Sequence, residues 1–137
     1  PVAEAENMFL DGDGKVVSAG KHLRPEDAGS FLCGEFLGLW RMSAAGAAIF
    51  TKAFDTIDAE LTPDMPFQQA AEWRRAYITD IVQHLINQGY QVDSGRIERG
   101  WAELDTEQDY RRLPAIAARQ NMTILQAALT SVQREEA

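Results

Sequence analysis

The sequence predicts an α/β (α+β) fold, in which a small mixed sheet of about four strands is covered by three or so helices. Two observations support this prediction. Short apolar runs bounded by Gly- and Asp-containing turns occur in the first twenty residues and again around residues 90–105, as expected for strands. In the segments between and after them, apolar residues recur every three or four positions, as on the buried face of a helix.

The bulk composition fits one globular domain over residues 1–137. Hydrophobic residues make up 45% of the chain, the usual globular value, and no apolar run is long enough to span a membrane. The 13 basic and 21 acidic residues give a net charge of -8, which opposes binding to nucleic acid. Cys33 is the only cysteine, and the first residues lack the features of a signal peptide, so we expect a cytoplasmic protein.

The first element is predicted to be a β-hairpin. Apolar runs at Asn7–Leu10 and Lys15–Ala19 flank the turn Asp11–Gly14, and Asp-Gly pairs favour a tight connection between strands. The same turn fails the pattern of a calcium-binding loop, because the fifth and last ligand positions would be Lys15 and His22. We therefore predict a hairpin that does not bind calcium.

A polar loop, a strand and a helix are predicted next. Residues 21–30 are polar and predict an irregular loop, whereas the mostly apolar segment Gly34–Met42 predicts a buried strand. Ser43 is then placed to cap a helix that continues through Ile57. Residues 61–66 contain two prolines and predict the turn that ends this region.

Two further helices are predicted in the second half of the chain. One runs from about Phe67 to Asn87, with Gly89 as its C-terminal capping residue. Its core-facing stripe consists of Ala70, Trp73, Tyr77, Ile81 and Leu85. The other is a C-terminal helix over residues 115–137.

Two strand candidates lie between these helices. Tyr90–Asp93 is the shorter one, and the second leads to a helix start near Thr106. On that second strand Trp101, Glu103 and Asp105 share one face, because side chains alternate along a strand. Two carboxylates on one face can hold a hard cation such as Mg²⁺ through oxygen ligands. The alternative is a solvated acidic strand end that leads into the helix.

The acidic pair belongs to a longer segment, Trp101–Leu113, with the sequence WAELDTEQDYRRL. This segment resembles the C-terminal metal-site segment of nucleotidyltransferases. The resemblance is greatest to the sugar-nucleotidyltransferase-like group that includes choline-phosphate and phosphonate cytidylyltransferases. Asp13–Lys21 is similar to their hairpin that ends in a substrate-facing lysine, and Gly34–Leu39 to the strand that follows. The resemblance covers roughly residues 7–113 and implies a GT-A-like nucleotidyltransferase fold.

The resemblance extends to one half of such an enzyme. The family begins with a glycine-rich loop between its first strand and helix, and the backbone amides of this loop hold the nucleotide phosphates. A mid-chain aspartate supplies a further metal ligand. No segment before Asn7 could contain a strand, a loop and a helix. We therefore expect the acceptor-binding, C-terminal half without the N-terminal nucleotide-binding half.

The resemblance also implies roles for individual residues. In this family the acceptor phosphate attacks the α-phosphorus of the nucleotide and pyrophosphate leaves, aided by Mg²⁺ and basic side chains. Lys21 would contact the acceptor phosphate, Glu35 would line the acceptor pocket, and either Glu103 or Asp105 would be the C-terminal metal ligand. Without the family, Lys21 is interpreted as a solvated loop lysine and Glu35 as an acid at a strand edge.

Histidine and cysteine chemistry is not favoured. His22 and His84 lack a second histidine at ligand spacing, and we interpret His84 as a surface residue. No base partner for Cys33 is identified, so we interpret it as a small buried hydrophobe.

Two functions follow as hypotheses. The first is a truncated or separately encoded nucleotidyltransferase-like domain, which binds Mg²⁺ and a phosphorylated small-molecule acceptor and is inactive without a partner half. The second is a non-catalytic domain with a vestigial site that forms a homo-oligomer, most simply a dimer. Apolar strand and helix faces left without the other half would be free to pair.

Overall fold

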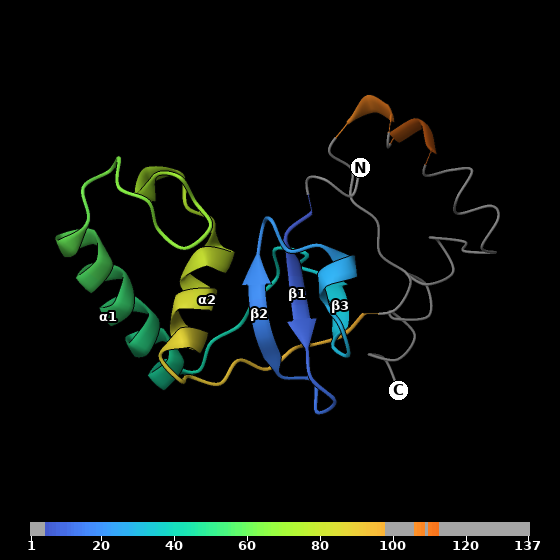
Figure 1. Ribbon diagram of the computed structural model, residues 1–137, viewed down its shortest axis with the longest axis horizontal. Helices are drawn as coiled ribbons and strands as arrows, with labels where there is room; N and C mark the ends of the chain where they lie inside the picture. Colours follow the sequence, from blue (N-terminus) through green and yellow to red (C-terminus); the bar gives the residue numbers. More distant parts are fainter. Residues whose placement is uncertain (1–4, 98–105, 109, 113–137) are drawn as a thin grey trace, which may run out of the picture. The chain divides into compact units, whose positions relative to one another are not determined.

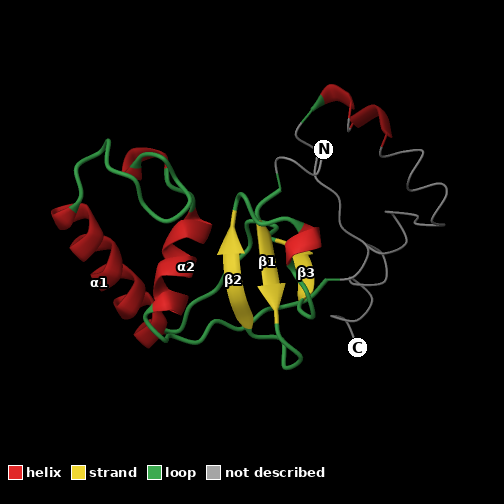
Figure 2. Ribbon diagram, in the orientation of Figure 1, coloured by secondary structure: helices red, strands yellow, loops and turns green. Residues whose placement is uncertain are grey.

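The computed structural model describes residues 5–97, 106–108 and 110–112. The chain divides into two compact units, residues 1–95 and 96–137. The elements of the first unit are β1 (Asn7–Leu10), β2 (Val16–Gly20), β3 (Leu32–Glu35), α1 (Ala44–Glu60) and α2 (Ile78–Asn87) (Figure 1). Short 3-10 segments lie at Pro25–Asp27 and Trp73–Arg75. This α/β architecture confirms the predicted class (Figure 2).

The sheet of the first unit has three antiparallel strands in the order β2-β1-β3. The predicted hairpin is confirmed, since β1 and β2 are its two arms. Of the other strand candidates, Tyr90–Asp93 contributes only an isolated bridge between Lys15 and Asp93. Residues 101–105 lie outside the described residues, so the fourth strand, the mixed sheet and the GT-A-like fold stay predictions.

A bulge in β2 decides which side chains face α2. Residue pairing changes register between Phe9 and Leu10, so that Phe9 pairs with Ser18 and Leu10 with Val16. The extra residue in β2 lets Val16 and Ala19, three positions apart, point to one face of the sheet. That face packs against α2, and the cluster comprises Leu10, Val16, Ala19, Met8, Val82, Ile86 and Val92.

α2 lies between the sheet and α1 in Figure 1, with β2 on one side and α1 on the other. A second cluster joins α1 to α2 and to the segment that precedes α2. Its buried members are Ile57, Phe67, Trp73 and Ile81, with Phe50, Leu61 and Ala76 packed against them. Ile57 is the one buried residue of the 17-residue helix α1.

The residues that cap the start of α1 and the end of α2 were predicted correctly. The Ser43 hydroxyl accepts a hydrogen bond from Gly46 N–H at 3.0 Å, as expected for the N-cap of α1. At the end of α2, Gly89 adopts φ 85°, a left-handed conformation that costs glycine little. Gly89 N–H donates to Ile86 and Tyr90 N–H donates to Leu85, the paired bonds of a Schellman motif.

Two predicted elements were wrong in their extent. The strand expected over Gly34–Met42 is instead β3 at Leu32–Glu35, and the chain beyond it is neither strand nor buried. The helix expected from Phe67 to Asn87 begins only at Ile78. In the second unit, residues 107–108 and 110–112 are helical, as predicted for a start after Thr106, whereas residues 115–137 lie outside the described part. In the part of the chain that the structure describes, no helix has the length and apolar character needed to cross a membrane.

Candidate functional site

Lys21, the predicted acceptor-binding lysine, lies directly after β2 and is half-buried. Its Nζ is 5.2 Å from the centroid of the Tyr77 ring, a cation–π arrangement. Tyr77 is the N-cap residue of α2, so the end of the hairpin meets the start of this helix. The two elements define a corner at which a cation, an aromatic ring and a helix start lie together.

Two buried polar residues that the sequence did not reveal hold this corner. Asp80 is 2% exposed, and its carboxylate accepts hydrogen bonds from the N–H groups of Tyr77 at 2.8 Å and Gln69 at 3.1 Å. Thr79 is fully buried, and its hydroxyl donates to Glu6 Oε2 at 2.6 Å. The carboxylates therefore occupy groups at the positive end of α2 that could otherwise bind an anion. An acid three residues after an N-cap is the signal that could have identified Asp80, but tyrosine is not a preferred N-cap residue.

Glu35, the predicted lining residue of the acceptor pocket, lies at the same end of the sheet as Lys21. Asn7 pairs with Gly20 on one side and with Glu35 on the other. Because directly paired residues share a face, Glu35 lies on the face of Asn7, opposite to the face of Met8 and Leu10 that packs on α2. Lys21 and Glu35 thus lie beside the same end of β1, one on each face of the sheet.

The metal-ligand pair Glu103 and Asp105 lies outside the described residues, so the Mg²⁺ site stays a prediction. Within the described ranges, no group of three or more His, Cys, Asp or Glu side chains could hold a metal ion.

Gly20 lies against the side chain of Gln69 in the loop before α2. A Cβ atom at this position would lie 2.3 Å from Gln69 Oε1 and 2.6 Å from Gln69 Cδ. Gln69 Oε1 also accepts a hydrogen bond from His22 N–H at 2.8 Å, which fixes the side chain beside the strand. The absence of a side chain at Gly20 is therefore part of how the corner is assembled.

We predict that Gly20→Ala lowers the free energy of unfolding by about 0.5–1.5 kcal/mol, because the new methyl group displaces the amide end of the Gln69 side chain and breaks its hydrogen bond to His22. Urea titration followed by circular dichroism measures this loss. Gly34→Ala is the matched control, since a Cβ there meets no atom within 4 Å. A Gly20→Ala protein no less stable than Gly34→Ala would contradict the tight contact.

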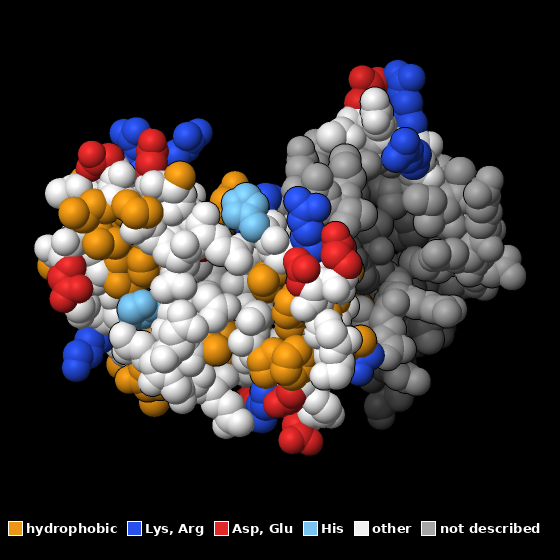
Figure 3. All heavy atoms as spheres, viewed as in Figure 1, with side chains coloured by type: hydrophobic (Ala, Val, Ile, Leu, Met, Phe, Trp, Pro, Cys, Tyr) orange, Lys and Arg blue, Asp and Glu red, His pale blue; other side chains and the backbone are white. Residues whose placement is uncertain are grey.

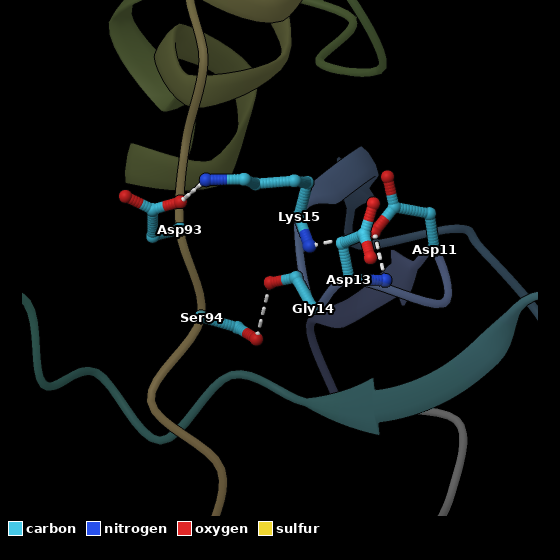
Figure 4. Close-up of polar contacts among 6 residues, drawn as sticks. All are labelled: Asp11, Asp13, Gly14, Lys15, Asp93 and Ser94. Carbon is cyan, nitrogen blue, oxygen red and sulfur yellow. Dashed lines mark hydrogen bonds and ion pairs between the residues drawn. The ribbon is translucent and has the colours of Figure 1, made fainter.

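The Asp-Gly turn at the opposite end of the hairpin is closed by its own side chains. Asp11 Oδ1 accepts hydrogen bonds from the N–H groups of Asp13 at 3.0 Å and Lys15 at 2.8 Å. Lys15 pairs with the Asp93 carboxylate, and the Ser94 hydroxyl donates to Gly14 O at 2.7 Å (Figure 4). One carboxylate oxygen of Asp11 thus closes the turn by accepting two backbone hydrogen bonds.

A groove of about 370 Å³ lies between α1 and the C-terminal end of α2. Its α1 wall includes Ile49, Lys52 and Ala53, and its other wall includes His84 and Tyr90. Contrary to the surface position predicted for it, His84 is half-buried, and its ring centroid is 5.6 Å from that of Phe67. His84 Nε2 is 3.0 Å from Gln88 Nε2, so the imidazole has a polar neighbour at the rim of the groove.

Cys33 lies in β3 and is half-buried, with its backbone paired to Phe9. Burial raises the pKa of the Cys33 thiol, so the reactive thiolate is less populated near neutral pH than for an ordinary cysteine. A raised pKa is the opposite of what a cysteine nucleophile requires, although the side chain is half-buried and not buried as predicted.

Comparison of the chain with protein-family models, with curated proteins and with solved structures gave no match.

Proposed function

We propose that this chain is the acceptor-binding part of a nucleotidyltransferase-like enzyme and is not catalytic alone. The observation that carries the proposal is the convergence of Lys21 and Glu35 at one end of the sheet, on either side of Asn7. Two strand spacings separate their backbones, about 10 Å. Because the two side chains lie on opposite faces, an acceptor bound by both would extend across the end of the sheet. The resemblance also implies an acceptor-binding role for both residues.

In this proposal the Lys21 ammonium binds the phosphate of the acceptor through charge-assisted hydrogen bonds. The Tyr77 ring keeps the ammonium over the start of α2 and so limits the orientations that Lys21 can adopt. Glu35 would bind a cationic or hydroxyl-bearing end of the same acceptor from the opposite face. Such binding positions the attacking phosphate oxygen, which is the main task of this half of the enzyme.

Glu103 and Asp105 would hold the Mg²⁺ ion, since two carboxylates supply the oxygen ligands that this ion prefers. When bound, the ion would neutralise charge on the phosphates. The nucleotide phosphates would be held by the partner half, which is why we propose no turnover for this chain alone.

We predict that the chain binds phosphocholine, used as a probe of a phosphorylated acceptor, and that Lys21→Met weakens this binding at least tenfold, because the phosphate loses its cationic partner. Isothermal titration calorimetry in the presence of Mg²⁺ and CTP measures the affinity. Lys15→Met is the matched control and should bind like the wild type, since Lys15 lies at the other end of β2 and pairs with Asp93.

The proposal fails if phosphocholine, CTP and Mg²⁺ give no heat and if adding the nucleotide-binding half of a cytidylyltransferase restores no turnover. Equal loss of binding in Lys15→Met and Lys21→Met would also contradict it, because the effect would then be one of general charge. The variants Glu103→Gln and Asp105→Asn should remove the Mg²⁺ dependence of binding and leave the fold, measured by circular dichroism, unchanged.

A second candidate function is self-association without catalysis, and exposed apolar side chains favour it. Leu39 is 77% exposed and Trp40 is 51% exposed, and Phe54 on α1 is also exposed. Figure 3 shows hydrophobic side chains gathered on the surface over α1. Large exposed apolar side chains of this kind are typical of interaction sites. Sedimentation velocity tests this function, and a single monomeric species at all concentrations would exclude it.

A further inference from the structure

The sheet of the first unit has one covered edge and one open edge. On the outer side of β2, Val16 N–H donates to Val92 O at 2.8 Å and Ala19 N–H donates to Gln83 Oε1 at 2.8 Å. Just beyond β2, Gln69 accepts from His22 N–H. On the outer side of β3, by contrast, no strand pairs within the described residues. An unpaired edge of this kind is a template for another strand.

The register shows which groups the open edge presents. Antiparallel pairs alternate between hydrogen-bonded and non-hydrogen-bonded, and Phe36 N–H donates to Glu6 O at 2.7 Å. Because hydrogen-bonded pairs alternate along the two strands, the backbone groups of Gly34 and Leu32 bond to β1. The backbone N–H and C=O groups of Cys33 and Glu35 therefore point away from β1, toward the open edge. Among the hydrogen bonds of the described chain, none involves these outward groups.

Exposed apolar side chains flank the same edge. Phe31 and Leu32 are each 45% exposed. Leu32 pairs with Leu10 and therefore shares the face that packs on α2, but α2 lies against β2. The part of this face over β3 is left partly uncovered, so a strand added to β3 would gain both backbone hydrogen bonds and apolar contacts.

We propose that the open edge of β3 pairs with β3 of a second copy of this chain, antiparallel and with Cys33 opposite Cys33 of the partner. The inference rests on the second candidate function, self-association, and specifies its interface. Two such sheets would join into one continuous sheet with the order β2-β1-β3-β3-β1-β2. An antiparallel strand pair is self-complementary about a twofold axis, as a closed dimer requires.

The charge on β3 selects this register. Glu35 is the one charged residue of the strand, and the chain as a whole is acidic, with a net charge of -8. Pairing centred on Cys33 places each Glu35 opposite Phe31 of the partner, so that the two carboxylates lie at opposite ends of the pair. Parallel pairing, or pairing centred on Glu35, would bring like charges side by side, which destabilises a sheet. In the Cys33 register the Glu35 N–H also faces a partner carbonyl.

Charge substitutions at the edge test the interface in the full chain. Sedimentation velocity over a hundredfold concentration range should show a monomer–dimer equilibrium, and Leu32→Lys should weaken dimer formation at least tenfold. Phe54→Lys tests the competing apolar surface over α1, because Phe54 is an apolar residue of similar exposure there, and this variant should dimerise like the wild type. Dimerisation lost in Phe54→Lys and retained in Leu32→Lys would overturn the β3 interface and leave self-association standing.

Cross-linking tests the register. Residues directly opposite in a hydrogen-bonded antiparallel pair have Cα atoms about 5.5 Å apart, within the range of a disulfide. Because Cys33 is the only cysteine, mild oxidation or a short bismaleimide should convert the dimer into one covalent species. The reaction is run well above neutral pH, since burial raises the pKa of the thiol.

The outcomes of these experiments distinguish the β3 register, self-association and acceptor binding from one another. A dimer that forms but does not cross-link through Cys33 overturns the register and therefore this inference. A wild-type chain that stays monomeric at all concentrations overturns the inference together with the second candidate function. Neither result affects phosphocholine binding, which tests the nucleotidyltransferase proposal independently. Cys33→Ser should remain a dimer by sedimentation and lose only the covalent product.

Discussion

Replacing Trp73 with alanine is expected to lower the free energy of unfolding by about 3–5 kcal/mol, the range for deleting a buried aromatic side chain. Trp73 is 8% exposed, and its ring packs edge-on against Phe67 with centroids 5.1 Å apart. The Phe54 ring lies 5.5 Å away, and the indole N–H donates to Asp58 Oδ1 at 3.0 Å. The substitution therefore removes contacts to α1 and to the segment before α2 at once. Urea unfolding followed by far-ultraviolet circular dichroism measures the loss.

Two controls separate the contributions to this effect. Trp73→Phe keeps most of the aromatic packing and should lose about 1 kcal/mol or slightly more, mainly from the hydrogen bond to Asp58. Trp40→Ala removes an indole that is 51% exposed and should cost about 1 kcal/mol or less. If Trp40→Ala were as destabilising as Trp73→Ala, the helical core would not be centred on Trp73.

Signals that act within a few residues predicted local structure correctly. The Asp-Gly turn specified the β1–β2 hairpin, Ser43 marked the start of α1 and Gly89 marked the end of α2. Each depends on a hydrogen bond or a backbone conformation set by the residue itself and its immediate neighbours. Such interactions are encoded where they occur, so a single sequence is enough to find them.

The strand expected over Gly34–Met42 failed because a strand also needs a partner. β1 is four residues long, and β3 pairs with it only from Leu32 to Glu35. Beyond that point no described strand is adjacent, Gly38 turns the chain with φ 73°, and Leu39 is exposed. An apolar run shows that a segment can be buried, but the length of its partner strand determines where pairing ends.

The helix expected from Phe67 failed for a different reason. The periodic stripe correctly identified Trp73, Ile81 and Leu85 as buried residues, but the chain reaches Trp73 through a loop, and Trp73 begins a 3-10 turn rather than a helix. Gln68 has φ 51°, and Gln69 N–H is bound by the Asp80 carboxylate rather than by a helical carbonyl. A side-chain hydrogen bond thus replaces the helical backbone bond at this position, and apolar periodicity does not reveal such an interaction.

The acceptor-binding roles of Lys21 and Glu35 stay predictions, but the structure explains their placement. The order of segments in the family led to Lys21 and Glu35, and the antiparallel pairing of both strands with β1 explains why they reach one end of the sheet. Thr79, Asp80 and Gln69 were missed, because their roles depend on which loop packs beside which helix start. Contacts between residues far apart in the chain, such as that of Thr79 with Glu6, leave no pattern in a single sequence.

Replacing Asp80 with alanine is the second change with a large expected effect, a loss of about 3 kcal/mol in the free energy of unfolding. The carboxylate accepts hydrogen bonds from Tyr77 and Gln69, and hydrogen bonds to a charged group contribute about 1.5–3 kcal/mol each. Removing the acceptor leaves both N–H groups without their partner at a position that is 2% exposed. Asp80→Asn keeps one acceptor oxygen, so about half of this loss is expected. Chemical denaturation of the three proteins under identical conditions measures the series.

Asp55→Asn is the matched control for Asp80, because Asp55 is an exposed carboxylate on α1 and the same substitution there should change stability by less than about 0.5 kcal/mol. The Asp80 variants should also shift the affinity for phosphocholine, since Asp80 fixes Tyr77 and Tyr77 in turn faces Lys21. An Asp80→Ala protein that is as stable as Asp55→Asn would show that the start of α2 is held by other contacts. A destabilised Asp80→Asn protein with unchanged binding, measured where it is still folded, would separate the fold of this corner from its proposed function.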